Sequence, residues 1–444
     1  MKNGHRAKRR IPAARRPRRL PCLALLVALP TTCLAVDLEY EFGVSAVHSD
    51  NIDLGEYGGL SDTVLAPHLR FALERRGSAV KLEARGEIEH RNYLENTYSN
   101  EWRGEIAAQL DWSIVPQHVD LVLEDYLSHQ PVDLGVGLSP GNVQRVNVFI
   151  GGPSFHARFN DATRFQLDLR AANSHAEVSR DFNGDRYSAA ARLQRELGPT
   201  HQASLNVVAT RADFDEAGGM SDFSREDAYV GYRREYARGL MEFELGRSRL
   251  RPEAGSGTES AGLARASVTW TPTARSRLHA DARYQLADST QDLIVRQADL
   301  NDFAMYDMSA SGLQVNADVY RQKRFALDYR YRGERLEVRL RPRYRSQRYL
   351  EDTGNDHEDY SGQVEIGYRV RPRLTLSLQA LALRREFPAS GRKDRDRTYG
   401  IEAEYRWTRQ LSLLGGVYRN TRDSNNADFE YSENVASIAM LWRR

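Results

Sequence analysis

Residues 101–114 read Glu-Trp-Arg-Gly-Glu-Ile-Ala-Ala-Gln-Leu-Asp-Trp-Ser-Ile, with apolar or small residues at every second position. Side chains on a β-strand point alternately to opposite faces, so this stretch predicts a strand with one apolar face and one polar face. The apolar face takes Trp102, Gly104, Ile106, Ala108, Leu110, Trp112 and Ile114, and the polar face takes Arg103, Glu105, Gln109 and Asp111.

The same alternating unit recurs from Leu38 to Trp442. Consecutive copies are joined alternately by a tight turn and by a longer polar loop. Tight turns are expected at 75–78, 115–118, 160–163, 198–200, 236–239, 272–276, 332–335, 371–373 and 408–410. Longer polar loops are expected near 48–62, 94–100, 129–144, 174–185, 212–223, 251–260, 287–312, 346–358, 388–396 and 421–432. Nine turns and ten loops join twenty strands and place both ends of the chain on the side of the short turns.

This pattern is typical of a transmembrane β-barrel. We therefore predict an all-β chain that folds as one antiparallel barrel of about 20 strands (18–22), with short periplasmic turns and longer extracellular loops. One phase runs through Leu313–Tyr331, so this segment is predicted as one long strand, with a bulge at Arg321–Lys323. A soluble β-solenoid is the alternative, but it needs a fixed short repeat, and none is visible.

Residues 1–35 have the pattern of a signal peptide. Residues 1–19 hold nine Lys or Arg and no acid, an apolar run follows, and cleavage is expected after Ala35. Removing these nine cations from the 63 basic residues leaves 54 against 61 acids, so residues 36–444 carry a net charge of −7 and suggest no nucleic-acid partner. Both cysteines, Cys22 and Cys33, are also removed, which suits passage through an oxidising periplasm.

Hydropathy and the aromatic residues agree with a barrel. Outside the signal peptide no apolar run approaches the roughly 20 residues that a membrane-spanning helix needs. Aromatic rings end eight strands beside the tight turns, as expected for a girdle at the membrane interface. These rings belong to Trp112, Phe159, Tyr232, Trp270, Tyr331, Tyr368, Trp407 and Trp442.

The polar strand faces are rich in charge, which a hydrated lumen tolerates and lipid does not. The ladder Arg339, Arg341, Arg343 and Arg345 places guanidinium groups about 7 Å apart, a spacing that can pass an anionic chain from site to site. Alternatively, these arginines pair with lumenal acids on neighbouring strands and brace the wall; we favour this interpretation because mixed-sign lumens do so in any barrel. The other lumen-lining candidates are Glu337, Lys81, Arg85, Asp168 and Arg170.

Enzyme and metal motifs are weak. Ser174 and His175 suggest a hydrolase, but adjacent strand residues point apart, whereas a nucleophile and its base must lie within hydrogen-bond reach. The acidic loops 181–185 and 352–356 lack the terminal Glu of a hand-type Ca²⁺ site. We therefore predict no catalytic residue, no metal site and no cofactor.

Short motifs resemble the β-barrel porin family of Gram-negative outer membranes. The first strand runs through residues 44–52 into the pair Asp50-Asn51, and Ser61-Asp62 and Pro67 follow; residues 152–155 and 319–321 are also similar to the family. Many members accompany exopolysaccharide and PEP-CTERM protein-sorting gene clusters, so the resemblance implies a role in exporting or anchoring surface polysaccharide. It supplies no catalytic residues.

The expected function is a passive outer-membrane channel or secretion component for exopolysaccharide. A structural or adhesion barrel with an occluded lumen is the first alternative, and an outer-membrane hydrolase is the second. Expected partners are outer-membrane lipid, the barrel assembly machinery, an anionic polysaccharide and periplasmic export components. A TonB-type transporter is disfavoured, because strand alternation begins within a few residues of the expected cleavage site.

Overall fold

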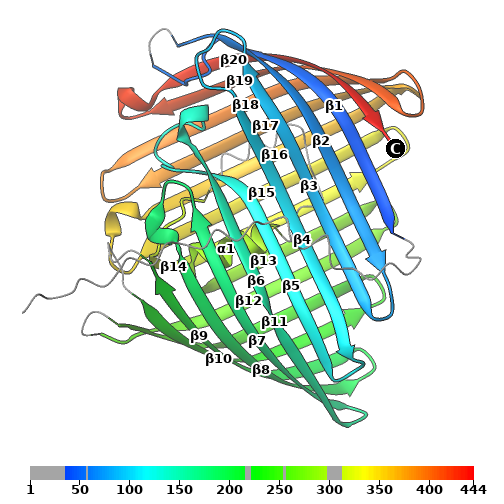
Figure 1. Ribbon diagram of the computed structural model, residues 1–444, viewed down its shortest axis with the longest axis vertical. Coiled ribbons are helices and arrows are strands. Elements are labelled where there is room, and N and C mark those ends of the chain that lie inside the picture. The colour runs from blue at the N-terminus through cyan, green and yellow to red at the C-terminus, as the bar shows by residue number, and fades with distance from the viewer. Residues whose placement is uncertain (1–35, 57–58, 216–221, 254–256, 298–312) are drawn as a thin grey trace, which may run out of the picture. The chain divides into compact units, whose positions relative to one another are not determined.

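The chain forms a closed β-barrel (Figure 1). The computed structural model describes residues 36–56, 59–215, 222–253, 257–297 and 313–444; the expected signal peptide lies outside them. Twenty strands form one sheet in which each strand pairs antiparallel with the next, and β1 (Asp37–Ser49) pairs with β20 (Tyr431–Arg443). Because the first and last strands pair, the sheet has no free edge. The predicted single antiparallel barrel of 20 strands is confirmed.

The strands run from 13 to 18 residues, long enough to cross a bilayer at a tilt. The remaining strands are β2 (Asp62–Arg76), β3 (Val80–Tyr93), β4 (Glu101–Val115), β5 (Val119–Pro131), β6 (Val143–Asn160), β7 (Thr163–Ala176), β8 (Gly184–Gly198), β9 (His201–Phe214), β10 (Phe223–Tyr236), β11 (Gly239–Pro252), β12 (Glu259–Thr273), β13 (Ser276–Asp288), β14 (Val319–Arg332), β15 (Leu336–Tyr349), β16 (His357–Arg371), β17 (Leu374–Phe387), β18 (Arg392–Arg406) and β19 (Leu411–Ser424).

Little of the described chain is helical. One α-helix, α1 (Ser289–Gln297), follows β13, and short 3-10 helices lie in other loops: η2 (Pro140–Asn142), η3 (Arg180–Phe182), η4 (Thr353–Asn355) and η5 (Ala427–Phe429). None of the helices in the described ranges is long and apolar enough to span a membrane.

Strand connections alternate between the two ends of the barrel, which we call the short-turn end and the long-loop end. Each of the nine predicted tight turns joins two paired strands, for example β16 to β17 through residues 372–373. Glycine is required at one place in β6: Gly152 has φ +159°, and a Cβ there would lie 2.0 Å from the carbonyl oxygen of Leu169 on β7.

The outer face carries the predicted apolar phase. Trp102 is 71% exposed and Ile114 50%, while Arg103 and Glu105, on the opposite phase, point into the barrel. The aromatic girdle is also confirmed. Seven of its eight rings are exposed at the short-turn end, namely Trp112, Phe159, Tyr232, Trp270, Tyr368, Trp407 and Trp442, and Tyr331 is half-buried.

One strand prediction was wrong at its start. Residues 313–318 are not part of a strand, and β14 begins only at Val319. Leu313, Val315 and Ala317 continue the apolar alternation of the strand, but they are buried against other parts of the protein. The predicted bulge at 321–323 is also wrong, because β13 and β14 pair without a register shift from Ser276↔Tyr331 to Asp288↔Val319.

Candidate functional site in the barrel lumen

The nine predicted lumen residues all lie on the inward phase of their strands, most of them in ion pairs. On β15, the Arg339 guanidinium lies 2.7 Å from Asp328 of β14, and Arg345 lies 2.5 Å from Asp359 of β16. Arg341 pairs with Glu365, and Arg343 is also engaged. The cross-strand pairing that we favoured for these arginines is therefore present. A role in passing solute remains a prediction.

The other predicted lumen residues make local contacts. Glu337 accepts hydrogen bonds from Arg330 and Arg332, and Arg85 pairs with Glu83 at 2.7 Å. Asp168 accepts from Ser154 at 2.6 Å, and Arg170 donates to the same hydroxyl at 2.7 Å and to the carbonyl of Pro153 at 2.9 Å. Asp168 and Arg170 therefore hold β7 to β6 near Gly152, and Lys81 is exposed at the short-turn end.

Along the inward face of β15, solvent exposure is high at Glu337 and at Arg343 and low from Arg345 onward. The side chain of Glu337, at the short-turn end of β15, is 47% exposed, whereas Arg339 is 16%, Arg341 12% and Arg345 10% exposed. Gln347, one step further, is fully buried. The lumen is therefore open to water at the short-turn end and filled with protein toward the long-loop end.

One filling element consists of α1 and residues 313–318, which together we call the insert. β12 pairs with β13 only as far as Ala264↔Tyr284, although β12 itself continues to Glu259. The freed ends of β13 and β14 stay paired with each other and turn inward. There Leu286 and Val319 pack against inward-facing apolar residues of β9 to β12: Ala212, Phe223, Leu250 and Ala261.

The insert crosses the lumen to a distant part of the wall. Leu293 of α1 clusters with Leu313 and Val315 and with inward-facing residues of β5 to β7, namely Tyr126, Val146, Val148, Ile150 and Ala176. The backbone N–H of Leu313 donates to the side chain of Gln130 on β5 at 3.2 Å. Figure 1 shows α1 within the ring of strands. Burial of these apolar groups stabilises the insert inside the barrel.

Two carboxylates anchor the insert. Asp288 accepts hydrogen bonds from Arg186 of β8 at 2.8 and 2.9 Å and also caps the start of α1 through the N–H of Gln291. Asp292, one turn into the helix, accepts from Tyr320 at 2.8 Å and from Gln322 at 2.6 Å. Both carboxylates are buried and hydrogen-bonded, so they hold the helix at a defined position.

The second filling element is the loop 132–139 between β5 and β6, which we call the strap. Asn142 fixes its shape by donating to the carbonyls of Asp133 and Gly137 and by accepting from the N–H of Asp133. The carbonyl groups of Leu134 and Gly135 in the strap then accept hydrogen bonds from strands β17 to β19, far along the barrel wall from β5 and β6.

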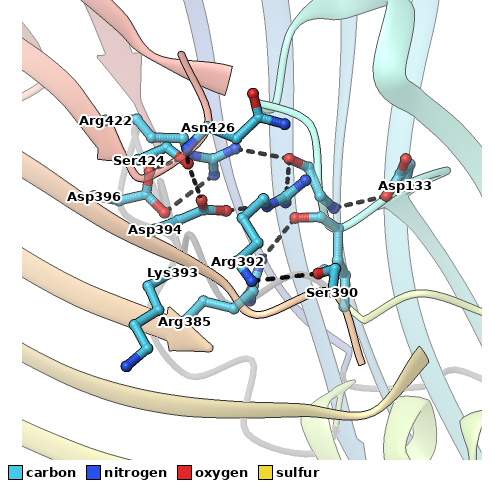
Figure 2. Close-up of polar contacts among 12 residues, drawn as sticks. Asp133, Arg385, Ser390, Arg392, Lys393, Asp394, Asp396, Arg422, Ser424 and Asn426 are labelled. Carbon is cyan, nitrogen blue, oxygen red and sulfur yellow. Dashed lines mark hydrogen bonds and ion pairs between the residues drawn. The ribbon is translucent and has the colours of Figure 1, made fainter. Parts of the chain in front are cut away.

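Three inward-facing arginines hold the strap, and we call Arg385, Arg392 and Arg422 the arginine latch (Figure 2). Arg385 donates to the carbonyl of Leu134 at 2.9 Å, and Arg392 and Arg422 donate to the carbonyl of Gly135 at 2.7 and 3.2 Å. A guanidinium group has several donors in a fixed fork, so each can bind the strap and an acid together.

Each latch arginine is also paired with an acid of the wall. Arg385 lies 2.8 Å from Asp359, Arg392 lies 2.9 Å from Asp394, and Arg422 lies 2.5 Å from Asp396. The Arg392 guanidinium also lies over the rings of Phe387 and Phe429, at 4.3 and 3.9 Å from their centroids. These contacts form a buried polar cluster, which costs free energy if any member is lost.

The predicted weakness of the enzyme motifs has a structural basis. Ser174 is inward and donates to the carbonyl of Phe182 at 2.9 Å, while its neighbour His175 takes the opposite phase. In the loop 352–356, Asp352 caps η4 by accepting from the N–H of Gly354. Within the described ranges, no group of three or more His, Cys, Asp or Glu is placed to hold a metal ion. The arrangement is that of a constricted lumen.

Residues 346–444 match the family described as "Putative beta-barrel porin 2". The resemblance to β-barrel porins is confirmed. The matched segment covers the wall from the end of β15 to β20 and includes the arginine latch. No curated protein matches the chain.

Solved outer-membrane barrels are similar to this barrel at low identity. A mutant ferric enterobactin receptor, PfeA, from Pseudomonas aeruginosa is 9% identical over 92% of this chain and 80% of its own, with a TM-score of 0.47. The FrpB iron transporter from Neisseria meningitidis is 8% identical over 92% and 82%, with a TM-score of 0.46. OccK2 from Pseudomonas aeruginosa, in complex with glucuronate, is 10% identical over 92% and 98%, with a TM-score of 0.38.

Neither the insert inside the lumen nor the arginine latch was found by the sequence analysis. The alternation does place Arg392, Asp394 and Asp396 on one inward phase, so a charged cluster there could have been found. The partners of the latch could not, because the strap lies about 250 residues earlier: Leu134 and Arg385 are separated by 251 positions.

Proposed function

We propose that this barrel, which has a porin-like fold, is a passive channel of a Gram-negative outer membrane. The short-turn end would be its wide, hydrated entrance, and the insert and the strap would form its constriction at the long-loop end. The observation that carries this proposal is the contrast along β15 between Glu337 and Arg343, which are exposed, and Arg345 and Gln347, which are buried. A hydrated lumen that narrows to a polar constriction selects solutes by size and charge.

We infer the cargo from the family resemblance: an exopolysaccharide that leaves the cell. Inward-facing hydroxyls, amides and charged groups can exchange hydrogen bonds with sugar hydroxyls without any chemical step. Signal-peptide cleavage near Ala35 and insertion by the barrel assembly machinery are part of this proposal. Polysaccharide export components on the periplasmic side are its expected partners.

An occluded scaffold is the second candidate. The observation that favours it is the buried arginine latch, which fastens the strap across the long-loop end. In that case the barrel would present its loops to partners and conduct nothing.

Planar-bilayer recording of the purified wild-type barrel separates the two. We expect discrete single-channel conductance, because water reaches the interior from the short-turn end. Deletion of the gene should then leave exopolysaccharide inside the cell envelope. A barrel that shows no conductance at any voltage would contradict the channel and favour the scaffold.

Labelling with an impermeant maleimide tests the orientation. Residues 36–444 contain no cysteine, so single cysteines can be placed at exposed positions: Thr353 and Ser390 at the long-loop end, and Ser78 and Pro199 at the short-turn end. On whole cells we expect the first two to react and the last two to stay unlabelled. All four should react after the outer membrane is permeabilised. The opposite pattern would place the short turns outside.

A further inference from the structure

Five exposed arginines gather on neighbouring hairpins at the short-turn end, and we call them the cationic arc. They are Arg335, Arg369, Arg371, Arg373 and Arg409, which lie on or beside the tight turns from β14 to β19. Their backbones are close together: the N–H of Arg369 donates to the carbonyl of Arg335, and the N–H of Arg406 donates to that of Arg373.

The arc lacks compensating acids. Among the described residues, none forms an ion pair with any of the five arginines; Arg373 donates only to the carbonyl of Trp407, at 3.5 Å. The nearby Glu334 and Glu337 already accept from Arg275 and from Arg330 and Arg332. The arc is therefore a local excess of positive charge.

The other half of the rim is largely neutralised, although Arg195, Arg238 and Arg277 there are exposed and form no ion pair with any described residue. Its tight turns carry arginines too, but Arg76 pairs with Glu74, Arg158 with Asp161 and Arg164 with Glu196. Arg233 pairs with Glu235 at 3.0 Å. A lipid leaflet surrounds a barrel on every side, so a surface for headgroups should recur on all the turns. The one-sided arc instead fits a discrete anionic partner.

The same wall continues into the lumen. Arg369 has the inward phase of Glu365, which pairs with Arg341 of the ladder, so the arc lies at the mouth above that ladder. Arg339, Arg341 and Arg345 of the ladder are paired with acids, so the uncompensated charge of the arc lies at the mouth rather than deeper in the lumen. Clustered charge at an entrance raises the local concentration of oppositely charged ligands.

We propose that the cationic arc captures carboxylate-bearing polysaccharide chains at the short-turn mouth. Guanidinium groups bind carboxylates in bidentate pairs, and five on adjacent hairpins offer a chain several contacts at once. This names the cargo as a polyanion, and it rests on the proposed channel for the passage of the chain once it is captured. The capture step itself needs no conduction.

Direct binding tests the arc. The full chain in phosphatidylcholine nanodiscs is titrated against fluorescent oligogalacturonate, with neutral dextran oligomers for comparison. Changing the five arc arginines to Gln should weaken oligogalacturonate binding about tenfold and leave dextran unaffected. Added salt should remove most of the difference, because these charges are exposed. Lysine at the five positions keeps the charge but cannot form bidentate pairs, so it should restore only part of the affinity.

The matched control changes five arginines of the other half of the rim to Gln: Arg76, Arg158, Arg164, Arg233 and Arg238. Both variants replace five arginines, so they lose the same net charge. The control arginines differ in their contacts: four of them are in ion pairs, and Arg238 donates to a backbone carbonyl as Arg373 does. We expect this variant to lose less than about twofold in affinity. Equal losses in both variants would overturn the proposal and indicate a general charge effect.

Native mass spectrometry tests the alternative that the cationic arc binds anionic lipid headgroups. An arc variant that binds oligogalacturonate normally but loses bound phosphatidylglycerol would overturn the proposal in favour of lipid headgroups. If the wild-type protein binds oligogalacturonate through the arc but shows no conductance, the capture site is supported and only the proposed channel function is contradicted.

Discussion

A barrel without the insert should conduct ions better than the wild type in planar bilayers, by about twofold or more. The variant replaces residues 289–317 with a short Gly-Ser linker that joins Asp288 to Asp318. The wild-type insert fills the interior between β13–β14 and β5–β7 with a helix and packed apolar side chains. Removing it widens the narrowest part of the aqueous path, and conductance rises with the area of that constriction.

A loop that stays outside the lumen provides the control. Residues 351–355 connect β15 to β16 at the same end of the barrel, and most of them are exposed. Replacing them with the same linker should leave conductance unchanged. If the insert variant conducts like the wild type while remaining folded, the insert is not the constriction.

The substitution Asp359→Ala should destabilise the folded barrel by about 3–5 kcal/mol. Asp359 is buried and accepts from Arg385 at 2.8 Å and from Arg345 at 2.5 Å. Alanine leaves two buried guanidinium groups facing each other with no acid between them. Urea unfolding in lipid vesicles, followed by the loss of heat-resistant folded mobility on gels, measures the change.

An exposed pair on the same wall serves for comparison. Arg397 and Asp423 lie 2.7 Å apart, but their side chains are 41% and 59% exposed. Asp423→Ala should therefore cost less than about 1 kcal/mol. Asp359→Asn keeps an acceptor oxygen and should fall between the two. Similar losses for Asp359→Ala and Asp423→Ala would show that the latch cluster does not stabilise the barrel.

The strand pattern could be predicted because its period is simple. Side chains alternate strictly along a strand, so the apolar face of 101–114 identifies its lipid face and, by exclusion, the inward phase of Arg103 and Glu105. Short turns contain few residues, so their positions could also be predicted from the sequence. The number of strands and the phase of the lumen residues followed from these two features.

The same alternation of side chains explains why the insert could not be predicted. Leu313, Val315 and Ala317 alternate like residues of a lipid-facing strand, and alternation does not distinguish lipid from a packed protein interior. The strap was equally hidden, because its contacts use backbone carbonyls, which every residue carries. Only the folded barrel brings Gly135 to Arg392 and Arg422.

The seam between β1 and β20 has a consequence for how the barrel forms. Ser49 and Glu433 hydrogen-bond across this seam although they are 384 positions apart in the chain, and Tyr40 and Arg444 exchange backbone hydrogen bonds there. Contacts between such distant residues form slowly, because a long loop must close first. Until the seam closes, both terminal strands expose unpaired backbone groups that can pair with other chains. The time between synthesis and closure is therefore when this protein is most prone to aggregate, and when it depends most on chaperones.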